Sequence, residues 1–268
     1  MANDLWPGLE WTAIYTGFTF LCTVAGAAGV FFLKPGGKTE LAETLSLGFA
    51  AGIMTAASVW SLIIPAQEMA EKQGDAPWLV ASLGIAAGAA FLKLLDAVLP
   101  HLHPGAAKPE GPKTKMHRAM LLFLAITLHN VPEGGSVGLT AGLAALSGDA
   151  ASLSAAFALA LGIGIQNIPE GAAVSLPLAG QGVGRMKAFL FGAGSGLVEP
   201  IFGLIAAASI SVFLPVMPFM LAFAAGAMLY VVVEELVPAA HLSQHSDSGT
   251  LSFILGFIIM MALDTALG

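Results

Sequence analysis

Residues 118–146 read RAMLLFLAITLHNVPEGGSVGLTAGLAAL, an apolar stretch that contains the polar phrase HNVPEG at residues 129–134. The stretch is longer than the roughly 20 residues an α-helix needs to cross the hydrocarbon core of a bilayer. A closely similar phrase, QNIPEG at residues 166–171, lies inside the next apolar stretch, residues 152–178. A carboxylate at membrane depth costs about 3 kcal/mol on insertion scales, so it normally has a partner or lies on a pathway. The two stretches therefore predict membrane-spanning helices that share a polar site.

The composition agrees with a membrane protein. Of the 268 residues 57% are hydrophobic and 10% are charged, and the mean hydropathy is +0.84. Soluble domains carry about 25% charged residues. Ten Lys and Arg residues without a basic stripe give no sign of nucleic-acid binding. A single cysteine, Cys22, excludes an internal disulfide framework and a cysteine-based zinc site.

Eight apolar stretches of spanning length predict an all-α integral membrane protein that forms one polytopic domain over residues 1–268. The first is read as a retained helix, because no basic residue precedes it as in a secretory signal. The long loop between the third and fourth stretches covers residues 101–117. The predicted spans are roughly 11–33, 43–65, 77–100, 118–146, 152–178, 187–214, 217–237 and 251–267.

The basic residues predict the orientation of these spans. Cytoplasmic loops of membrane proteins carry an excess of Lys and Arg. Here nearly all basic residues follow odd-numbered spans or precede even-numbered ones, and Lys72 alone lies on the opposite side. We therefore expect both termini to be extracytoplasmic and the loop 101–117 to be cytoplasmic, in a multi-pass membrane protein.

The spacing inside the two phrases suits a metal ion. His129 and Glu133 are four residues apart and so lie on one helix face, and Asn130 is three residues from the same carboxylate. Gln166, Asn167 and Glu170 repeat this arrangement in the second phrase. Each phrase also contains a proline, which removes a backbone donor and is expected to kink its helix. We predict that these six side chains form one intramembrane metal site.

The donor set restricts the kind of metal. One imidazole together with carboxylate and amide oxygens suits divalent cations such as Zn²⁺, Fe²⁺, Mn²⁺ or Cd²⁺, whereas the absence of thiolates disfavours Cu(I). Glu199, midway along the sixth span, is expected to complete the site. Four further residues are candidates for a secondary or exit site, although the first two also fit an interfacial acid pair. They are Glu234, Glu235, His241 and Asp264.

Glycine is frequent within the spans, as at Gly48 and Gly52 or Gly134 and Gly138. Small residues let helix backbones approach closely in lipid. Two interpretations stay open at this point, namely tight packing alone and a smooth surface along which one group of helices slides.

With both phrases and the segment GSGLVEP at residues 194–200, the chain resembles the ZIP (Zrt/Irt-like protein) family of divalent metal transporters, most closely its GufA-like bacterial branch. The resemblance implies a 3+2+3 arrangement of eight spans, with spans four and five carrying the metal site. It implies import of divalent metal, foremost Zn²⁺ but also Cd²⁺, Fe²⁺, Mn²⁺ or Co²⁺, as a transported substrate and not a cofactor. The ligands would be His129, Asn130, Glu133, Gln166, Asn167, Glu170 and Glu199.

The resemblance also implies features of mechanism and assembly. Glu133 and Glu170 would bridge two adjacent ions, and spans one, four, five and six would slide against the others in alternating access. The partners are then metal ions and lipid, with a homodimer as a candidate assembly. Many relatives have His where this chain has Gln166, which would soften the preference for Zn²⁺.

Two other function classes stay open as alternatives. A metal-selective channel needs sites weak enough for flux, which clustered charged ligands on glycine-lined helices do not suit. A membrane metallohydrolase of the common protease type needs H-E-x-x-H, and His129 is followed by Asn130 instead. We therefore predict a carrier and not an enzyme.

Overall fold

The computed structural model describes residues 2–32, 39–98, 118–180, 182–240 and 247–267, and all regular structure within these ranges is helical. Seven helical stretches of the described chain are long and apolar enough to cross a membrane. These seven are Gly8–Phe31, Leu47–Gln73, Pro77–Leu95, Ala150–Gly180, Arg185–Ala208, Leu214–Glu234 and Ser248–Leu267. The predicted all-α membrane class is confirmed. The fourth expected span is a helix of 30 residues, α5 (Arg118–Ser147), but it is not among the seven, so the count of eight stays a prediction.

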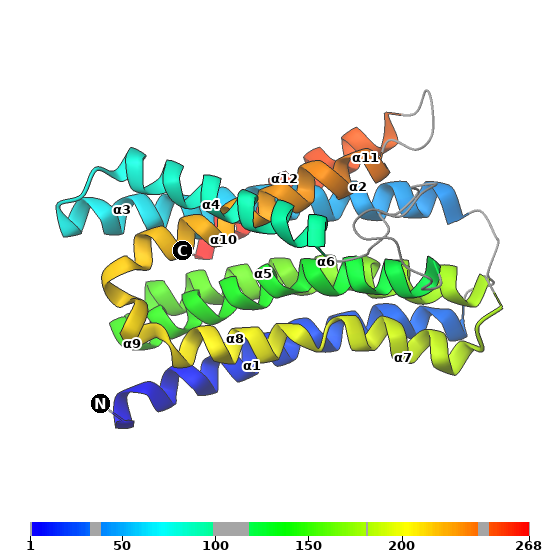
Figure 1. Ribbon diagram of the computed structural model, residues 1–268, viewed down its shortest axis with the longest axis horizontal. Coiled ribbons are helices and arrows are strands. Elements are labelled where there is room, and N and C mark those ends of the chain that lie inside the picture. The colour runs from blue at the N-terminus through cyan, green and yellow to red at the C-terminus, as the bar shows by residue number, and fades with distance from the viewer. Residues whose placement is uncertain (1, 33–38, 99–117, 181, 241–246, 268) are drawn as a thin grey trace.

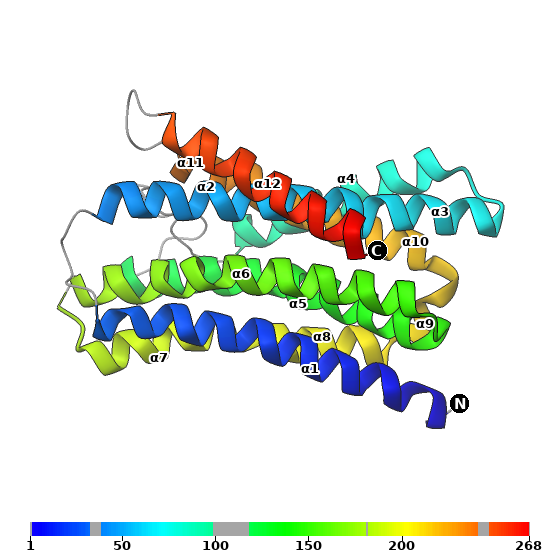
Figure 2. The same ribbon diagram turned by 180° about the vertical axis from the view of Figure 1, so that it is seen from behind.

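The helices run along one common direction and form two layers (Figures 1 and 2). The first layer, which we call the motif layer, holds both phrases. It consists of α1 (Ala2–Ala27), α5, α6 (Ala150–Gly180), α7 (Arg185–Ser195) and α8 (Val198–Ala208). The second, which we call the support layer, consists of α2 (Thr39–Ala57), α3 (Ile64–Gln73), α4 (Pro77–Val98), α10 (Met217–Val231), α11 (Val237–Ala240) and α12 (Ser248–Leu267). A short helix, α9 (Ile210–Phe213), leads from one layer to the other.

The hydrophobic core lies between the layers, where α2 and α12 contact α6 and where α10 contacts α5. Large apolar side chains from both layers are fully buried there, among them Ile53, Met260 and Ile163. The sulfur of Met260 reaches Gly162 on α6, where a Cβ atom would collide with it. The layers therefore meet mainly through large, flexible side chains.

Close glycine contacts lie mostly inside the layers. A Cβ atom on Gly52 would collide with the backbone of Phe253 on α12, and one on Gly88 with that of Phe223 on α10. In the motif layer, a Cβ atom on Gly138 would collide with the backbone of Gly203. These glycines let neighbouring backbones touch, as small residues do in membrane helix bundles. Their positions support the tight-packing interpretation over that of a glycine-lined sliding surface.

Three predicted spans differ from the observed helices. The second does not end at Pro65 but continues through a π-helical segment (Ser58–Ile63) and α3 to Gln73. The seventh contains another π-helical segment, Val232–Leu236, before α11. The sixth is interrupted at residues 196–197, which separates α7 from α8. Proline at the start of α3 is tolerated because the first turn of a helix lacks internal acceptors for its N–H groups.

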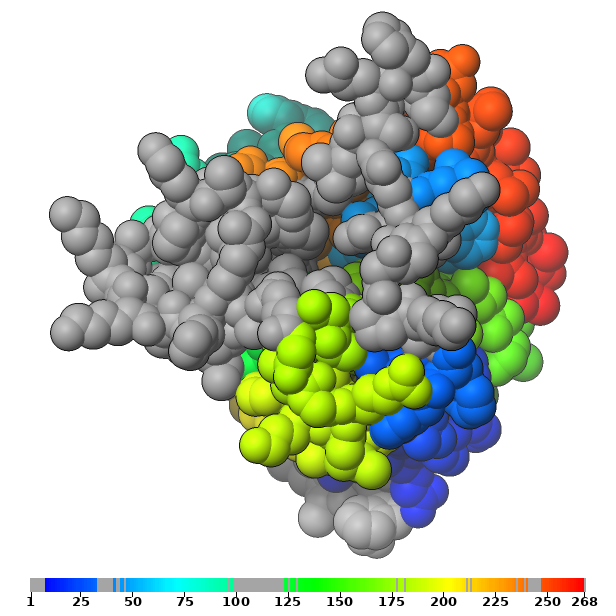
Figure 3. Space-filling model, turned by 90° about the vertical axis from the view of Figure 1, so that its right-hand side faces the viewer, coloured from blue at the N-terminus to red at the C-terminus, as the bar shows by residue number. Residues whose placement is uncertain are grey.

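Local contacts fix the ends of the motif layer. Asp149 precedes α6 and accepts hydrogen bonds from the backbone N–H (2.8 Å) and hydroxyl (2.7 Å) of Ser152. Both bonds lower the pKa of Asp149, to about 2, and the bond from the backbone N–H of Ser152 has the larger effect. At the other end of the molecule the start of α7 lies beside the end of α1 (Figure 3). There Arg185 donates to the carbonyl of Phe31 (3.3 Å), and the rings of Phe31 and Phe189 lie 5.3 Å apart.

Candidate functional site

The two phrases face each other from neighbouring helices, α5 and α6, and α8 completes the cluster. Both helices continue through Pro132 and Pro169 without a break. The break at residues 196–197 instead places Glu199 in the first turn of α8. Six of the seven predicted ligands have described side chains, and all six are buried: Asn130, Glu133, Gln166, Asn167, Glu170 and Glu199.

Glu133 is the centre of this cluster. Gln166 donates a hydrogen bond from Nε2 to Oε1 of Glu133 at 2.5 Å, which joins the two phrases directly. The carboxylates of Glu133, Glu170 and Glu199 lie near enough for each pair to interact electrostatically. Three negative charges in a buried space repel one another strongly, because the effective dielectric constant is lower there than in water. A bound cation would offset this repulsion.

Glu199 forms a second group of contacts with α6 and α1. The side-chain nitrogen of Asn167 lies 2.8 Å from Oε1 and 2.9 Å from Oε2 of Glu199. The same nitrogen lies 3.1 Å from the carbonyl oxygen of Thr19, and the hydroxyl of Thr23 donates to Oε1 of Glu199 at 3.3 Å. Three helices therefore meet at this carboxylate.

Several acceptor oxygens in the cluster have no donor. Asn130 donates from Nδ2 to the carbonyl of Ser195 at 2.9 Å, which leaves its side-chain oxygen free. Four buried acceptors of the cluster lack a hydrogen-bond donor within the described part of the chain: Oδ1 of Asn130, Oε2 of Glu133, Oε1 of Gln166 and Oδ1 of Asn167. Buried polar atoms are almost always paired, so a group of unpaired acceptors calls for a specific explanation such as a cation.

The carboxylates alone do not make a closed metal cage. Among the described side chains, no three His, Cys, Asp or Glu residues are gathered closely enough to hold an ion. The side chain of His129 lies outside the described part of α5. An ion held here would therefore depend on amide oxygens and on this histidine as well as on the carboxylates.

The four secondary candidates do not form one group. Asp264, in the last turns of α12, is buried and accepts a hydrogen bond from Ser61 at 2.6 Å. Glu234 is exposed and precedes α11, which lies toward the other end of the support layer (Figure 1). The side chain of Glu235 and the whole of His241 lie outside the described residues. The end of α12 and α11 lie toward opposite ends of the support layer, so a secondary role of Asp264 and an exit role of Glu234 stay two separate predictions.

The sequence-based prediction missed the contribution of α1. Four threonines on this helix are fully buried, and two of them, Thr19 and Thr23, reach the Asn167–Glu199 pair. Their spacing gives a signal that was available, since Thr12, Thr16, Thr19 and Thr23 recur at helical intervals on one face.

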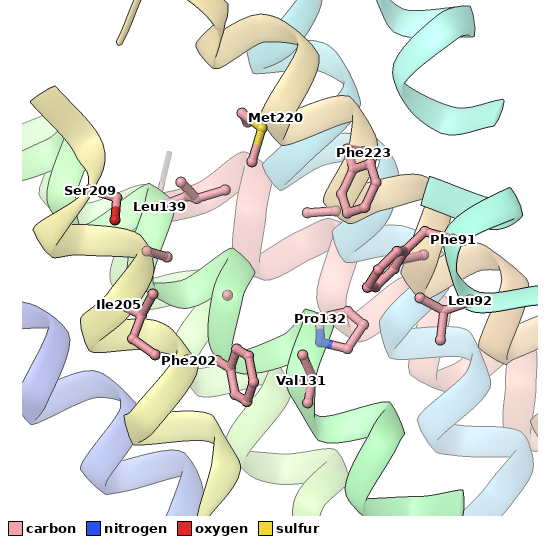
Figure 4. Close-up of a pocket in the computed structure, with 14 residues that line it drawn as sticks. Phe91, Leu92, Val131, Pro132, Leu139, Phe202, Ile205, Ser209, Met220 and Phe223 are labelled. Carbon is pink, nitrogen blue, oxygen red and sulfur yellow. The ribbon is translucent and has the colours of Figure 1, made fainter. Parts of the chain in front are cut away.

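An apolar cavity of about 230 Å³ lies beside this cluster, between the two layers (Figure 4). Val131 and Pro132 of α5 face Phe91 and Leu92 of α4 across it. Among the described residues that line it, Ser209 alone has a polar side chain. The cavity therefore offers no ligands to a metal ion, but it leaves space between the layers at the level of the first phrase.

Comparison with known proteins identifies the family. Residues 109–264 match the family model described as ZIP Zinc transporter. The chain belongs to the ZIP zinc transporter family. It is 37% identical to the zinc transporter ZIP11 of Homo sapiens over 94% of this chain and 96% of that protein. It is 33% identical to the zinc transporter GufA of Myxococcus xanthus over 92% of this chain and 95% of that protein.

Another bacterial member of the ZIP family shows a similar likeness. The zinc transporter ZIPB of Bordetella bronchiseptica is 38% identical over 93% of this chain and 79% of its own length. The matches thus extend over nearly the whole chain, including both phrases and the α8 segment. Family membership and the seven apolar helices together make the chain a multi-pass membrane protein.

Proposed function

We propose that this ZIP family member imports divalent metal ions, Zn²⁺ foremost, through the buried cluster on α5, α6 and α8. The observation that carries the proposal is the set of four buried acceptor oxygens without donors, gathered around three carboxylates. The relatives are named as zinc transporters and not as enzymes, which supports the same substrate and disfavours the metallohydrolase alternative.

In this proposal the ion binds between the two phrases. Glu133, Glu170 and Gln166 supply oxygens, and His129 supplies the imidazole from the same helix face as Glu133. Asn130, Asn167 and Glu199 border this position. Two carboxylates balance the charge of one divalent ion, so the occupied site avoids the high cost of an uncompensated buried charge. Weak oxygen ligands also suit an ion that must be released.

The orientation of the chain in the membrane is inferred from its ends and its basic residues. The chain ends lie toward the same end of the molecule in Figure 1, which requires an even number of crossings and supports α5 as an eighth span. Arg185 and Lys187 lie at the opposite end, at the start of α7. The positive-inside rule then places this end in the cytoplasm of a bacterial cell and both termini outside. The homodimer stays a prediction.

Alternating access would arise from movement of the motif layer against the support layer. Helices of each layer touch through backbone contacts at glycines, whereas the layers meet mainly through side chains and border the apolar cavity. Such an interface between two stiff units permits the rigid-body displacement by which many transporters work.

Filling the cavity should therefore impede transport. Ala206 of α8 lines it, and we expect Ala206→Phe to lower the maximal rate of Zn²⁺ uptake about tenfold, equivalent to about 1.4 kcal/mol of added barrier. The apparent KM should stay unchanged, because no ligand moves. Ala208→Phe on the exposed face of the same helix is the matched control. Equal rates for the two variants would contradict movement at this interface.

Gln166 offers a test of metal preference. Imidazole binds late first-row metals more strongly than an amide oxygen does, so Gln166→His should lower the KM for Zn²⁺. We expect a change of about tenfold, or about 1.4 kcal/mol. The change for Mn²⁺ should be smaller. Competition of each metal against radiolabelled Zn²⁺ in proteoliposomes measures both values, and equal shifts for the two metals would argue against Gln166 as a ligand.

Uptake kinetics test the proposed function itself. Purified protein in proteoliposomes should take up Zn²⁺ with saturable kinetics and without single-channel currents. Uptake that rises linearly with Zn²⁺ concentration, accompanied by unitary currents, would favour the channel instead. Proteoliposomes that take up no divalent metal would overturn the proposal.

A further inference from the structure

The carboxylate of Glu199 is fully supplied with donors by the protein itself. Asn167 approaches both of its oxygens through one nitrogen, at 2.8 and 2.9 Å, and Thr23 approaches Oε1 at 3.3 Å. The carbonyl of Thr19 lies 3.1 Å from the same nitrogen. Since a primary amide carries two hydrogens, this NH₂ group is fully committed to Glu199 and Thr19.

Glu133, in contrast to Glu199, is only partly supplied with hydrogen-bond donors. It has one amide donor, from Gln166 to Oε1, while its Oε2 has no donor within the described part of the chain. Oδ1 of Asn167 is also without a donor, although the NH₂ group of the same side chain is fully used. The buried cluster therefore divides into a group that lacks donors, at Glu133, and a group that is complete, at Glu199.

The NH₂ group of Asn167 occupies the place that a cation would need beside Glu199. It carries partial positive charge and contacts both carboxylate oxygens, as a bound cation would. A second divalent ion at Glu199 would have to displace these hydrogen bonds and would gain no charged ligand from Asn167. The internal amide thus takes over the role of a second ion.

The hydroxyl of Thr23 lies 3.3 Å from Oε1 of Glu199 and 3.3 Å from the carbonyl oxygen of Thr19 on its own helix, so its single hydrogen is shared between the two acceptors. Its helix, α1, packs tightly at the break between α7 and α8, since a Cβ atom on Gly196 would collide with the side chain of Thr23. The break lies against α1 at Gly196, and Glu199 follows it by two residues. Thr23 and Asn167 therefore hold Glu199 from two sides.

We infer that the transport site holds one divalent ion at a time, and that Thr23 of α1 is a positioning residue that keeps Glu199 and Asn167 paired. The inference rests on the proposed function for the position of the ion at Glu133. It assigns Glu199 to orienting Asn167, whose Oδ1 has no donor within the described part of the chain, and not to holding a second ion.

The number of bound ions tests the claim that the transport site holds one ion at a time. Tag-free protein in nanodiscs is equilibrated with Zn²⁺ and the bound metal is counted by mass spectrometry. Asn167→Asp replaces the NH₂ group with a carboxylate, and we expect it to bind one Zn²⁺ more than the unchanged protein. An unchanged count would overturn the inference. Glu199→Gln should bind as many Zn²⁺ ions as the unchanged protein. Loss of an ion from this variant would also overturn the inference, and this test holds even if Asn167→Asp fails to fold.

Transport kinetics of Thr23 variants test the claim that Thr23 is a positioning residue. Thr23→Val removes the hydroxyl and keeps the shape, and we expect KM for Zn²⁺ to rise about fivefold with little change in maximal rate. Thr23→Ser should restore the KM. Thr16→Val is the matched control, because the buried Thr16 hydroxyl donates only to the carbonyl of Thr12 at 2.7 Å. Equal KM values for Thr23→Val and Thr16→Val would contradict the role of Thr23.

Failure of this inference can be told apart from failure of the proposed function. Under the proposed function, Glu133→Gln loses the transported ion whether the site holds one ion or two. If Glu133→Gln keeps all bound Zn²⁺, the site itself is misplaced. If it loses Zn²⁺ while Asn167→Asp gains none, only the single-ion inference is wrong.

Discussion

Replacement of Glu133 by alanine is expected to reduce Zn²⁺ uptake to background, a loss of at least about 100-fold. This carboxylate is fully buried, joins the two phrases through Gln166 and interacts with both other carboxylates. Changes to residues that merely support metal ligands already cost about 10- to 100-fold. Initial rates of radiolabelled Zn²⁺ uptake in proteoliposomes, corrected for the amount of inserted protein, measure the loss.

The control for this variant is Glu68→Ala. Glu68 is an exposed carboxylate on α3, outside the cluster, and its loss should leave the rate within about twofold because surface charges contribute little. Normal uptake by Glu133→Ala protein that reaches the membrane would show that the ion takes another route. Equal losses in both variants would point to a general effect of charge.

The second large effect is expected at Gly134. A Cβ atom there would collide with the backbone of Glu199, and rigid backbone cannot yield as a flexible side chain can. Gly134→Ala should therefore separate α5 from α8, displace Glu199 and lower stability by about 3 kcal/mol, the upper end of ordinary overpacking. Both the midpoint of thermal unfolding in detergent and the rate of Zn²⁺ uptake should fall.

Gly135→Ala is the matched control for Gly134→Ala, because it adds the same methyl group at the next residue. Gly135 has nothing within 4 Å of the position of a Cβ atom. Alanine favours a helix over glycine by about 1 kcal/mol, so Gly135→Ala should be neutral or slightly stabilising and should transport normally. If the two variants behaved alike, the close approach of α5 and α8 would not control the geometry of the cluster.

Much of the cluster could be predicted from the sequence because its signals are local. The spacing of His129 and Glu133 follows from helix geometry, and the apolar surroundings of the phrases imply burial. The burial of Glu133, Gln166 and Glu199 in one cluster follows from pairing two similar phrases with one more intramembrane acid.

Other features depend on long-range packing and could not be predicted in this way. The break between α7 and α8 lies in the segment GSGLVEP, whose glycines permit a break but do not require one, and the close contact of Gly196 with Thr23 is a long-range feature. Threonine hydroxyls usually bond to a carbonyl of their own helix, as those of Thr16 and Thr23 both do, so the sequence alone does not indicate that Thr23 also contacts Glu199. The continuation of the second span beyond Pro65 likewise depends on packing, since proline is tolerated both in the first turn of a helix and in turns.

The position of the bound metal tests the central claim most directly. Crystals grown with Zn²⁺ and measured at the zinc absorption edge give an anomalous signal at each bound ion. We predict a peak between α5 and α6 within about 2.0–2.2 Å of oxygens from Glu133 and Glu170, the usual zinc–carboxylate distance. Zinc peaks that lie only elsewhere, in protein that transports Zn²⁺ in proteoliposomes, would contradict the account.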